Sequence, residues 1–338
     1  MENILEQIVK NKKVEETNKL DAVKIVNSLF GDLMDRERDV LTRRFGLSGN
    51  KSETLEKIGG LHNLTRERVR QIEAGSIRKL KKLENLETYL TDIKKTVNEL
   101  LGVHGGLMEQ EFLLDILALF CIDAKSSDSE RLVYKRNFDF IISKLLEDQV
   151  EKTEKSEHFN SFYSLKNQAI SHLEEIVGEL NSKISKINKT VNIDELLEVV
   201  KGLDSYTKHQ EKLNTGSDSD ITEIFKSEVF PELGEIINAN KPLYSLIQAA
   251  KKIDRNKFGH WGNNESPEIS PKKISDKIYL VLKNNSKPMH FTEIADKINE
   301  VGFDRKKANY GTCHNELILD DRYVLTDRGM YGLKEWAK

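Results

Sequence analysis

The chain has 338 residues, an apolar content of 38% and a formal net charge of −3 at pH 7, a composition that argues against a membrane-embedded or largely disordered protein. It holds no apolar run long enough to span a bilayer, and charges stand near its start where a secretory signal would be apolar. Five prolines among many Lys, Glu, Leu and Ile predict a mainly α-helical, multidomain protein of the cytoplasm. Residues 1–100 hold 20 basic and 17 acidic side chains, and residues 270–338 hold 13 and 10. Both ends therefore suit a polyanion, whereas the middle of the chain is acidic.

The first predicted elements are helices. Residues 1–30 carry apolar side chains at helical spacing and are predicted to be an N-terminal helical extension. Its second half leads directly into a domain predicted over residues 31–85. Its first half is either a packed helix or a handle for a partner, and the sequence leaves both readings open.

Residues 55–80, LEKIGGLHNLTRERVRQIEAGSIRKL, predict two short helices joined by a tight turn. Thr65 is placed to cap the second helix, and Glu67 adds a favourable charge to its first turn. At 100° per residue, one face of this helix is predicted to pack against the domain. The residues on that face are Val69, Ile72, Ser76 and Leu80.

The opposite face mixes side chains that can read base edges with side chains that can grip phosphate. The residues predicted to bind DNA here are Arg66, Glu67, Arg68, Arg70, Gln71 and Lys79. Residues 65–82 hold seven basic groups and two acidic ones, in a chain that is acidic overall. A solvated amphipathic helix is the alternative reading of such a run. The run stands, however, where a helix-turn-helix has its recognition helix.

Residues 32–83 resemble region 4 of the bacterial sigma-70 family of RNA polymerase sigma factors. Two motifs carry the resemblance: RERDVLTRRFGL in the first pair of helices, and LEKIG followed by TRERVRQIEAGSIRKL. The resemblance implies that bases and phosphates of an upstream promoter element are contacted by Arg66, Glu67, Arg68, Arg70 and Gln71. It also implies that the preceding helices, with Leu33, Val40 and Phe45, help to dock on RNA polymerase. The aromatic-rich region that melts promoters in a complete sigma factor is not recognisable before residue 32, so we expect no promoter opening by this protein alone.

Beyond this domain the sequence repeats itself. Residues 188–200, NKTVNIDELLEVV, align without gaps with residues 286–298, SKPMHFTEIADKI, and both switch from a period of two to a helical period. The endings HFNSFYSLK and TDRGMYGLK each place an aromatic residue and a Leu two apart, on one side of a last strand. We therefore predict tandem winged-helix-like units with small β-wings, the middle one degenerate. Their ranges are 101–166, 167–265 and 270–338.

The last unit is predicted element by element. Helices are expected over residues 274–285, 292–302 and 306–320, a short strand before the second, and a hairpin over residues 322–333. The motifs KPMHFTEIA, CHNELI and RYVLTDRGMYGL resemble the HARE-HTH family, winged helices similar also to the delta subunit of Gram-positive RNA polymerase. If the third helix enters a DNA groove, its first residues and the wing make the contacts. The candidates are Lys306, Lys307, Asn309, Tyr310, Thr312 and, on the wing, Arg328. Protein docking alone is the open alternative.

No catalytic or metal-binding signature is present. The sequence has no P-loop, no Gly-x-Ser-x-Gly and no His-Glu-x-x-His. Cys121 and Cys313 lie far apart, without metal-ligand spacing, and are predicted to be buried reduced thiols. We therefore expect no enzyme activity, no cofactor or metal, and no small-molecule substrate.

Two functions remain open at this point. The first is a sequence-specific DNA-binding transcription factor related to sigma factors, with double-stranded DNA and the RNA polymerase core as partners, no membrane contact, and a place at the bacterial nucleoid. The alternative is a delta-like protein-interaction subunit associated with RNA polymerase, whose DNA binding is non-specific.

Overall fold

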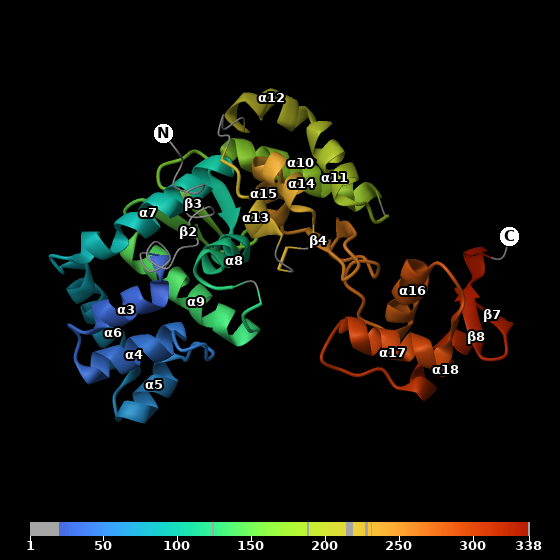
Figure 1. Cartoon of the computed structure of the whole chain (residues 1–338), viewed down its shortest axis with the longest axis horizontal. Coiled ribbons are helices and arrows are strands. Elements are labelled where there is room, and N and C mark those ends of the chain that lie inside the picture. The colour runs from blue at the N-terminus through green and yellow to red at the C-terminus, as the bar shows by residue number, and fades with distance from the viewer. Residues whose placement is uncertain are drawn as a thin grey trace. The chain divides into compact units, whose positions relative to one another are not determined.

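The computed structural model describes residues 20–123, 125–187, 189–213, 219–226, 229–230 and 232–336. These residues are mainly α-helical and carry small antiparallel sheets (Figure 1), so the predicted mainly α, multidomain class is confirmed. They fall into two compact units: residues up to 177 with 204–250, and residues 178–203 with those from 251 onward. Within the described ranges, no helix is long and apolar enough to cross a membrane. The predicted extension lies outside the described residues as far as residue 19.

The first unit begins with the helix-turn-helix domain. Its helices are α3 (Ala22–Phe30), α4 (Asp35–Phe45), α5 (Leu55–His62) and α6 (Arg66–Lys81). The last three helices each place one fully buried side chain in a common core, namely Val40, Ile58 and Val69. Because these side chains come from three helices, the core fixes α6 relative to the two helices before it.

A second, sheet-bearing part of the first unit follows the order helix, strand, helix, helix, hairpin. Its elements are α7 (Leu86–Val103), β1 (Leu107–Glu109), α8 (Gln110–Cys121), α9 (Asp128–Phe140), a π-helical turn (Ile141–Leu145), β2 (Val150–Thr153) and β3 (Phe162–Leu165). The strands are arranged in the order β1-β3-β2. Tyr163 of β3 is fully buried, and its hydroxyl donates a hydrogen bond to the carboxylate of Asp139. The closing strand that the sequence predicts at HFNSFYSLK is therefore confirmed.

Helix α9 packs against the helix-turn-helix domain as well as against its own sheet-bearing part. The fully buried ring of Phe140 lies 5.9 Å from the ring of Phe30 and 5.0 Å from the ring of Phe45, measured between centroids. Asn137 donates a hydrogen bond of 2.9 Å to the backbone carbonyl of Leu47. Figure 1 shows α9 lying beside α3 and α4. The two parts therefore share one hydrophobic core.

Further helices complete the first unit. They are α12 (Asp204–Leu213), α13 (Thr222–Phe225), α14 (Gly234–Ala239) and α15 (Lys241–Ala249), while α10 (Ser171–Ile187) begins in the first unit and ends in the second. The rings of Phe225, Phe230 and Tyr244 lie 5.4–6.2 Å from the ring of Phe112 in α8. Residues 204–250 thus pack with the sheet-bearing part, although the sequence places them in a middle unit. The predicted domain boundaries stay a prediction.

The second unit starts with α11 (Ile193–Lys201) and a hairpin of β4 (Ile253–Arg255) and β5 (Trp261–Asn263). Val191 exchanges two backbone hydrogen bonds of 2.8 and 2.9 Å with Trp261. Asn192 then caps α11 by accepting the backbone N–H of Glu195. The strand predicted near residue 190 is therefore reduced to one bridging residue.

The C-terminal module, α16 to β8, repeats the order of the sheet-bearing part. Its elements are α16 (Ile274–Asn285), β6 (Met289–His290), α17 (Phe291–Val301), α18 (Tyr310–Leu319), β7 (Tyr323–Asp327) and β8 (Met330–Leu333), followed by a 3-10 turn (Lys334–Trp336). Its strand order, β6-β8-β7, also places the last strand between the other two. The predicted elements of this module are confirmed except at the start of α18, which lies at Tyr310 rather than Lys306. Asn309 sets that start by accepting the backbone N–H of Gly311.

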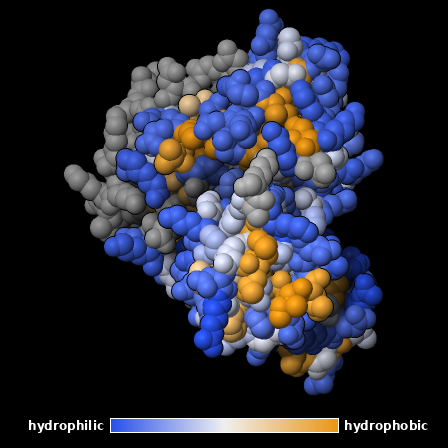
Figure 2. Space-filling model, turned by 90° about the vertical axis from the view of Figure 1, so that its right-hand side faces the viewer, coloured by the Kyte–Doolittle hydropathy of each residue, from blue (hydrophilic) through white to orange (hydrophobic). Residues whose placement is uncertain are grey.

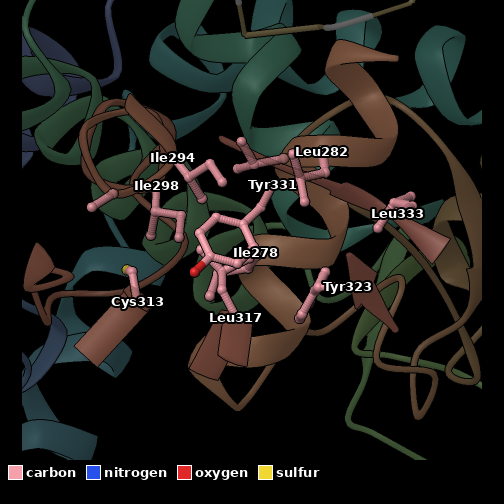
Figure 3. Close-up of a cluster of buried hydrophobic side chains, with 11 residues drawn as sticks. Ile278, Leu282, Ile294, Ile298, Cys313, Leu317, Tyr323, Tyr331 and Leu333 are labelled. Atoms are coloured by element: carbon pink, nitrogen blue, oxygen red, sulfur yellow. The ribbon is translucent and has the colours of Figure 1, made fainter. Parts of the chain in front are cut away.

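The core of the C-terminal module lies between its helices and its sheet (Figure 3). Tyr331 and Leu333 of β8 face Ile278 and Leu282 of α16 there, as the spacing of an aromatic and a Leu two apart predicts. The hydroxyl of Tyr323 donates to the backbone carbonyl of Ser275. The predicted buried thiol is confirmed for Cys313 in this core, whereas Cys121 of the first unit is only half-buried.

Candidate nucleic-acid interface

Helix α5 has no room for a side chain where the turn before α6 packs on it. The helix is capped at its end by Asn63, which adopts a left-handed conformation with φ of 56°. The backbone N–H of Leu64 then donates a 2.9 Å hydrogen bond to the carbonyl of Gly59. A Cβ atom on Gly59 would lie 2.6 Å from the carbonyl oxygen of Leu64. This close approach fixes the direction in which α6 leaves the turn.

Helix α6 is capped and packed as predicted. The side chain of Thr65 accepts the backbone N–H of Arg68 at 3.2 Å. The packing-face residues Val69, Ser76 and Leu80 are fully buried. Ser76 donates its hydroxyl to the carbonyl of Ile72, so no buried polar atom is left unsatisfied there. The opposite face is consequently left for solvent or a partner.

The residues predicted to read DNA at the start of α6 are all exposed, namely Arg66, Glu67, Arg68, Arg70 and Gln71. In the free protein four of them form hydrogen bonds with one another. Arg70 donates hydrogen bonds of 2.8 and 2.7 Å to the two carboxylate oxygens of Glu67, and Arg68 donates one of 3.2 Å to Gln71. The bond from Arg70 lowers the pKa of Glu67, so the carboxylate stays charged. Arg66 and Arg68 form no ion pair with any other described residue.

Lys79, also predicted to bind DNA, lies in the last turns of α6. Its ammonium group donates to the carboxylate of Glu37 in α4. Burial raises the pKa of Glu37, but the hydrogen bonds from Lys79 and from the backbone of Met34 outweigh this and lower it. Lys79 would therefore have to exchange a carboxylate for a phosphate in order to bind DNA.

In the C-terminal module, three predicted residues meet around the start of α18. Lys307 lies in the loop before the helix, Asn309 is its N-cap, and Tyr310 is its first residue. The hydroxyl of Tyr310 donates a 2.8 Å hydrogen bond to Asp296 of α17, and its ring is half-exposed. Arg328 lies apart from them in sequence, exposed on the turn between β7 and β8. Within the described part of the chain, no three His, Cys, Asp or Glu side chains are grouped as metal ligands would be.

Comparison with known proteins identifies the helix-turn-helix domain. Residues 29–82 match the family model described as "Sigma-70, region 4". They form a sigma-70 region 4 domain. The RNA polymerase sigma factor SigA1 of Synechococcus elongatus is 52% identical over 56 residues, which are 17% of this chain and 14% of that protein. The sigma factor SigA of Lactococcus lactis subsp. cremoris is 39% identical over 79 residues, 23% of this chain and 22% of that protein.

The similarity covers a small part of the chain, 17% of it for one relative and 23% for the other. The chain spans less than a quarter of the length of these curated relatives. The alignments do not reach the C-terminal module, so its resemblance to the HARE-HTH family stays a prediction. No solved structure matches the chain.

The residues that the sequence assigns to polymerase docking lie inside the region 4 domain. Leu33 is 4% exposed and Val40 is fully buried. Phe45 is half-buried beneath Phe140, with the ammonium of Lys144 5.8 Å from its ring centroid. These side chains hold the domain together and hold it to α9. Their docking role stays a prediction, and a contact of Leu33 or Val40 with polymerase requires a change in this packing.

Polar contacts also join the helices of this domain, and those between different helices have no signal in the sequence. Arg44 of α4 reaches Glu73 of α6 at 3.3 Å, across 29 residues of chain. Asp39 accepts Arg43 at 2.8 Å and lies 2.7 Å from the ring nitrogen of His62 at the end of α5. Burial raises the pKa of Asp39, but these two partners outweigh burial and lower it. Only the Asp39–Arg43 pair, four residues apart on α4, could be predicted from its spacing.

Proposed function

We propose that this chain is a non-catalytic DNA-binding transcription factor. Its region 4 domain recognises an upstream promoter-like element, and the protein contacts RNA polymerase at the bacterial nucleoid. The observation that carries this proposal is the exposed first half of α6, which presents Arg66, Glu67, Arg68, Arg70 and Gln71 on a rigid helix-turn-helix. The names of the relatives, all RNA polymerase sigma factors, support it for the matched segment.

The contacts of the α6 side chains in the free protein indicate which of them supply affinity for DNA and which supply sequence preference. Arg66 and Arg68 have unneutralised charges and are suited to phosphate oxygens, which supply affinity without sequence preference. Glu67 neutralises Arg70, so the pair adds little to non-specific attraction. On a matching duplex, Arg70 and Gln71 turn to purine edges and Glu67 accepts from a cytosine amino group. The pair therefore contributes to discrimination more than to affinity.

The test is fluorescence anisotropy of the full chain on a duplex with a consensus upstream element and on a scrambled duplex. We expect the chain to prefer the consensus by roughly tenfold or more, since a good base contact is worth about 1–3 kcal/mol. Arg70→Ala lowers binding to the consensus duplex. Glu67→Ala removes the preference while leaving affinity for the scrambled duplex equal or higher, because it deletes a negative charge from the interface.

Lys95→Ala is the matched control, since Lys95 is an exposed cation on α7, outside the helix-turn-helix. It should leave the preference between duplexes unchanged. Equal affinity of the unmodified chain for both duplexes contradicts promoter recognition.

That result would favour the second function, a polymerase-associated interaction protein. Exposed apolar side chains give it an independent basis. Figure 2 shows hydrophobic patches among the hydrophilic residues on one face of the molecule. In the C-terminal module Ile318 and Leu319 of α18 are 61% and 79% exposed, and Leu325 of β7 is 59% exposed. Retention of polymerase core on the immobilised full chain, lost on Ile318→Asp, would support this alternative.

A further inference from the structure

The C-terminal module has a basic pocket. Only some of its lining residues are among those predicted from the sequence to bind DNA. The pocket has a volume of about 570 Å³ and lies where the segment before α16 meets the loop between α17 and α18. Its charged lining residues are Lys272, Lys277, Asp304, Arg305, Lys306 and Lys307. Lys272, Lys277 and Arg305 were not anticipated from the sequence.

The loop that forms one wall of the pocket is held from both sides. Lys277, whose side chain is 7% exposed, forms an ion pair of 2.5 Å with Asp304. Asp304 also accepts the backbone N–H of Lys306 at 2.9 Å. Asn299 of α17 accepts the N–H of Ala308 at 2.7 Å and donates to its carbonyl at 3.1 Å. The basic side chains therefore project from a fixed backbone, which lowers the entropy lost when they bind a ligand.

The pocket carries positive charge that the protein does not neutralise. Its one lining carboxylate, Asp304, is already bound to Lys277, whose hydrogen bond lowers the pKa of Asp304. Lys272, Arg305 and Lys307 form no ion pair with any described residue, and Arg305, Lys306 and Lys307 are exposed. Such a surface attracts an anion with several charges. Lysine and arginine side chains of this kind supply phosphate contacts in protein–DNA complexes.

We propose that this pocket binds backbone phosphates of double-stranded DNA, and that Lys272 and Arg305–Lys307 provide the contacts. The proposal rests on the proposed DNA-binding function and adds to it a second, sequence-independent DNA contact on the C-terminal module. The pocket is also lined by Asn309 and Thr312 at the start of α18. A duplex held by its phosphates in the pocket therefore lies within reach of the helix end predicted to face a groove.

The salt dependence of DNA binding tests this proposal. Each phosphate contact contributes about 0.9 to the slope of log affinity against log salt for B-DNA. For the full chain on a scrambled duplex, we expect Lys306→Ala/Lys307→Ala to reduce the magnitude of the slope by about 1.8. The same variant should weaken consensus and scrambled duplexes by equal factors. Lys306→Arg/Lys307→Arg should keep the original slope, because the charges remain.

The matched control is Lys287→Ala/Lys334→Ala, which removes two exposed cations of the same module from outside the pocket. It should leave the slope unchanged. A slope that is the same in the pocket variant, the control and the unmodified chain overturns the proposal. A failure of the proposed function would be recognised separately, as equal affinity for the consensus and scrambled duplexes. That ratio of affinities depends on α6 and not on the pocket.

A second arm distinguishes a duplex from a small phosphate ligand. Inorganic pyrophosphate is titrated into the full chain in a calorimeter, without DNA and at physiological salt. We expect no saturable binding, because one small anion at physiological salt replaces fewer phosphate contacts than a duplex backbone supplies. Saturable binding that the pocket variant abolishes, with an unchanged DNA slope, would overturn the assignment to DNA.

Discussion

Replacing Phe140 with alanine should lower the free energy of unfolding of the first unit by about 3–5 kcal/mol, the range for a fully buried phenylalanine. The ring contacts Phe30 and Phe45 of the region 4 domain from α9, so its loss leaves a cavity between two parts of the chain. We expect the amides of α3 and α4 to lose hydrogen-exchange protection together with those of α9. Urea unfolding of the full chain, combined with hydrogen exchange, measures both effects.

Leu132→Ala is the control for this experiment, because Leu132 lies on the same helix and is 36% exposed. Its effect should stay within about 0.5 kcal/mol, as for most surface substitutions. A loss below about 1 kcal/mol for Phe140→Ala, with the protection of α3 and α4 unchanged, would contradict a shared core.

The second large effect is expected at the turn before α6. Gly59→Ala places a Cβ 2.6 Å from the carbonyl oxygen of Leu64, and a backbone atom cannot move aside as a flexible side chain can. Overpacking of this kind costs about 1–3 kcal/mol. Since the turn must open to relieve it, α6 is displaced and DNA binding through Glu67 and Arg70 should fall as well. Urea unfolding and anisotropy on the consensus duplex record the two losses.

The neighbouring residue gives a matched comparison. Gly60 lies in the same helix, and a Cβ there meets nothing within 4 Å. Gly60→Ala should be neutral or stabilising by up to about 1 kcal/mol, because alanine favours a helix over glycine. If both substitutions had the same effect on unfolding and on DNA binding, the close approach at Gly59 would not be what positions α6.

Local patterns were enough to predict the elements of the helix-turn-helix and of the C-terminal module. The cap at Thr65 and the buried face with Val69 and Leu80 depend on neighbours within one or two turns. The closing strand with Tyr331 follows from alternation. The start of α18 was placed too early, because Lys306 and Lys307 favour a helix as well as the residues after them do. A side-chain cap at Asn309 decides the boundary instead.

Contacts between distant segments could not be predicted. Phe45 and Phe140 are 95 residues apart, and no pattern in the sequence indicates that their rings are in contact. The same holds for the Lys79–Glu37 pair. From the sequence alone, Lys79 is therefore predicted to be available for DNA phosphates. The exposure of the charged and polar residues at the start of α6 was predictable, because it needs only the period of one helix. The neutralisation of Lys79 by Glu37, in contrast, depends on packing between α6 and α4 that a single sequence does not encode locally.

The packing of Phe140 against the region 4 domain also affects the order in which the protein can be completed during synthesis. Phe30 and Phe45 leave the ribosome well before their partner, since 57 residues lie between Lys82 and Phe140. At translation rates of about 5–20 residues per second, this takes roughly 3–12 s. During that interval the domain has its helices but carries an uncovered aromatic face. A chain that stops at residue 85 lacks Phe140 and therefore leaves the rings of Phe30 and Phe45 without this partner.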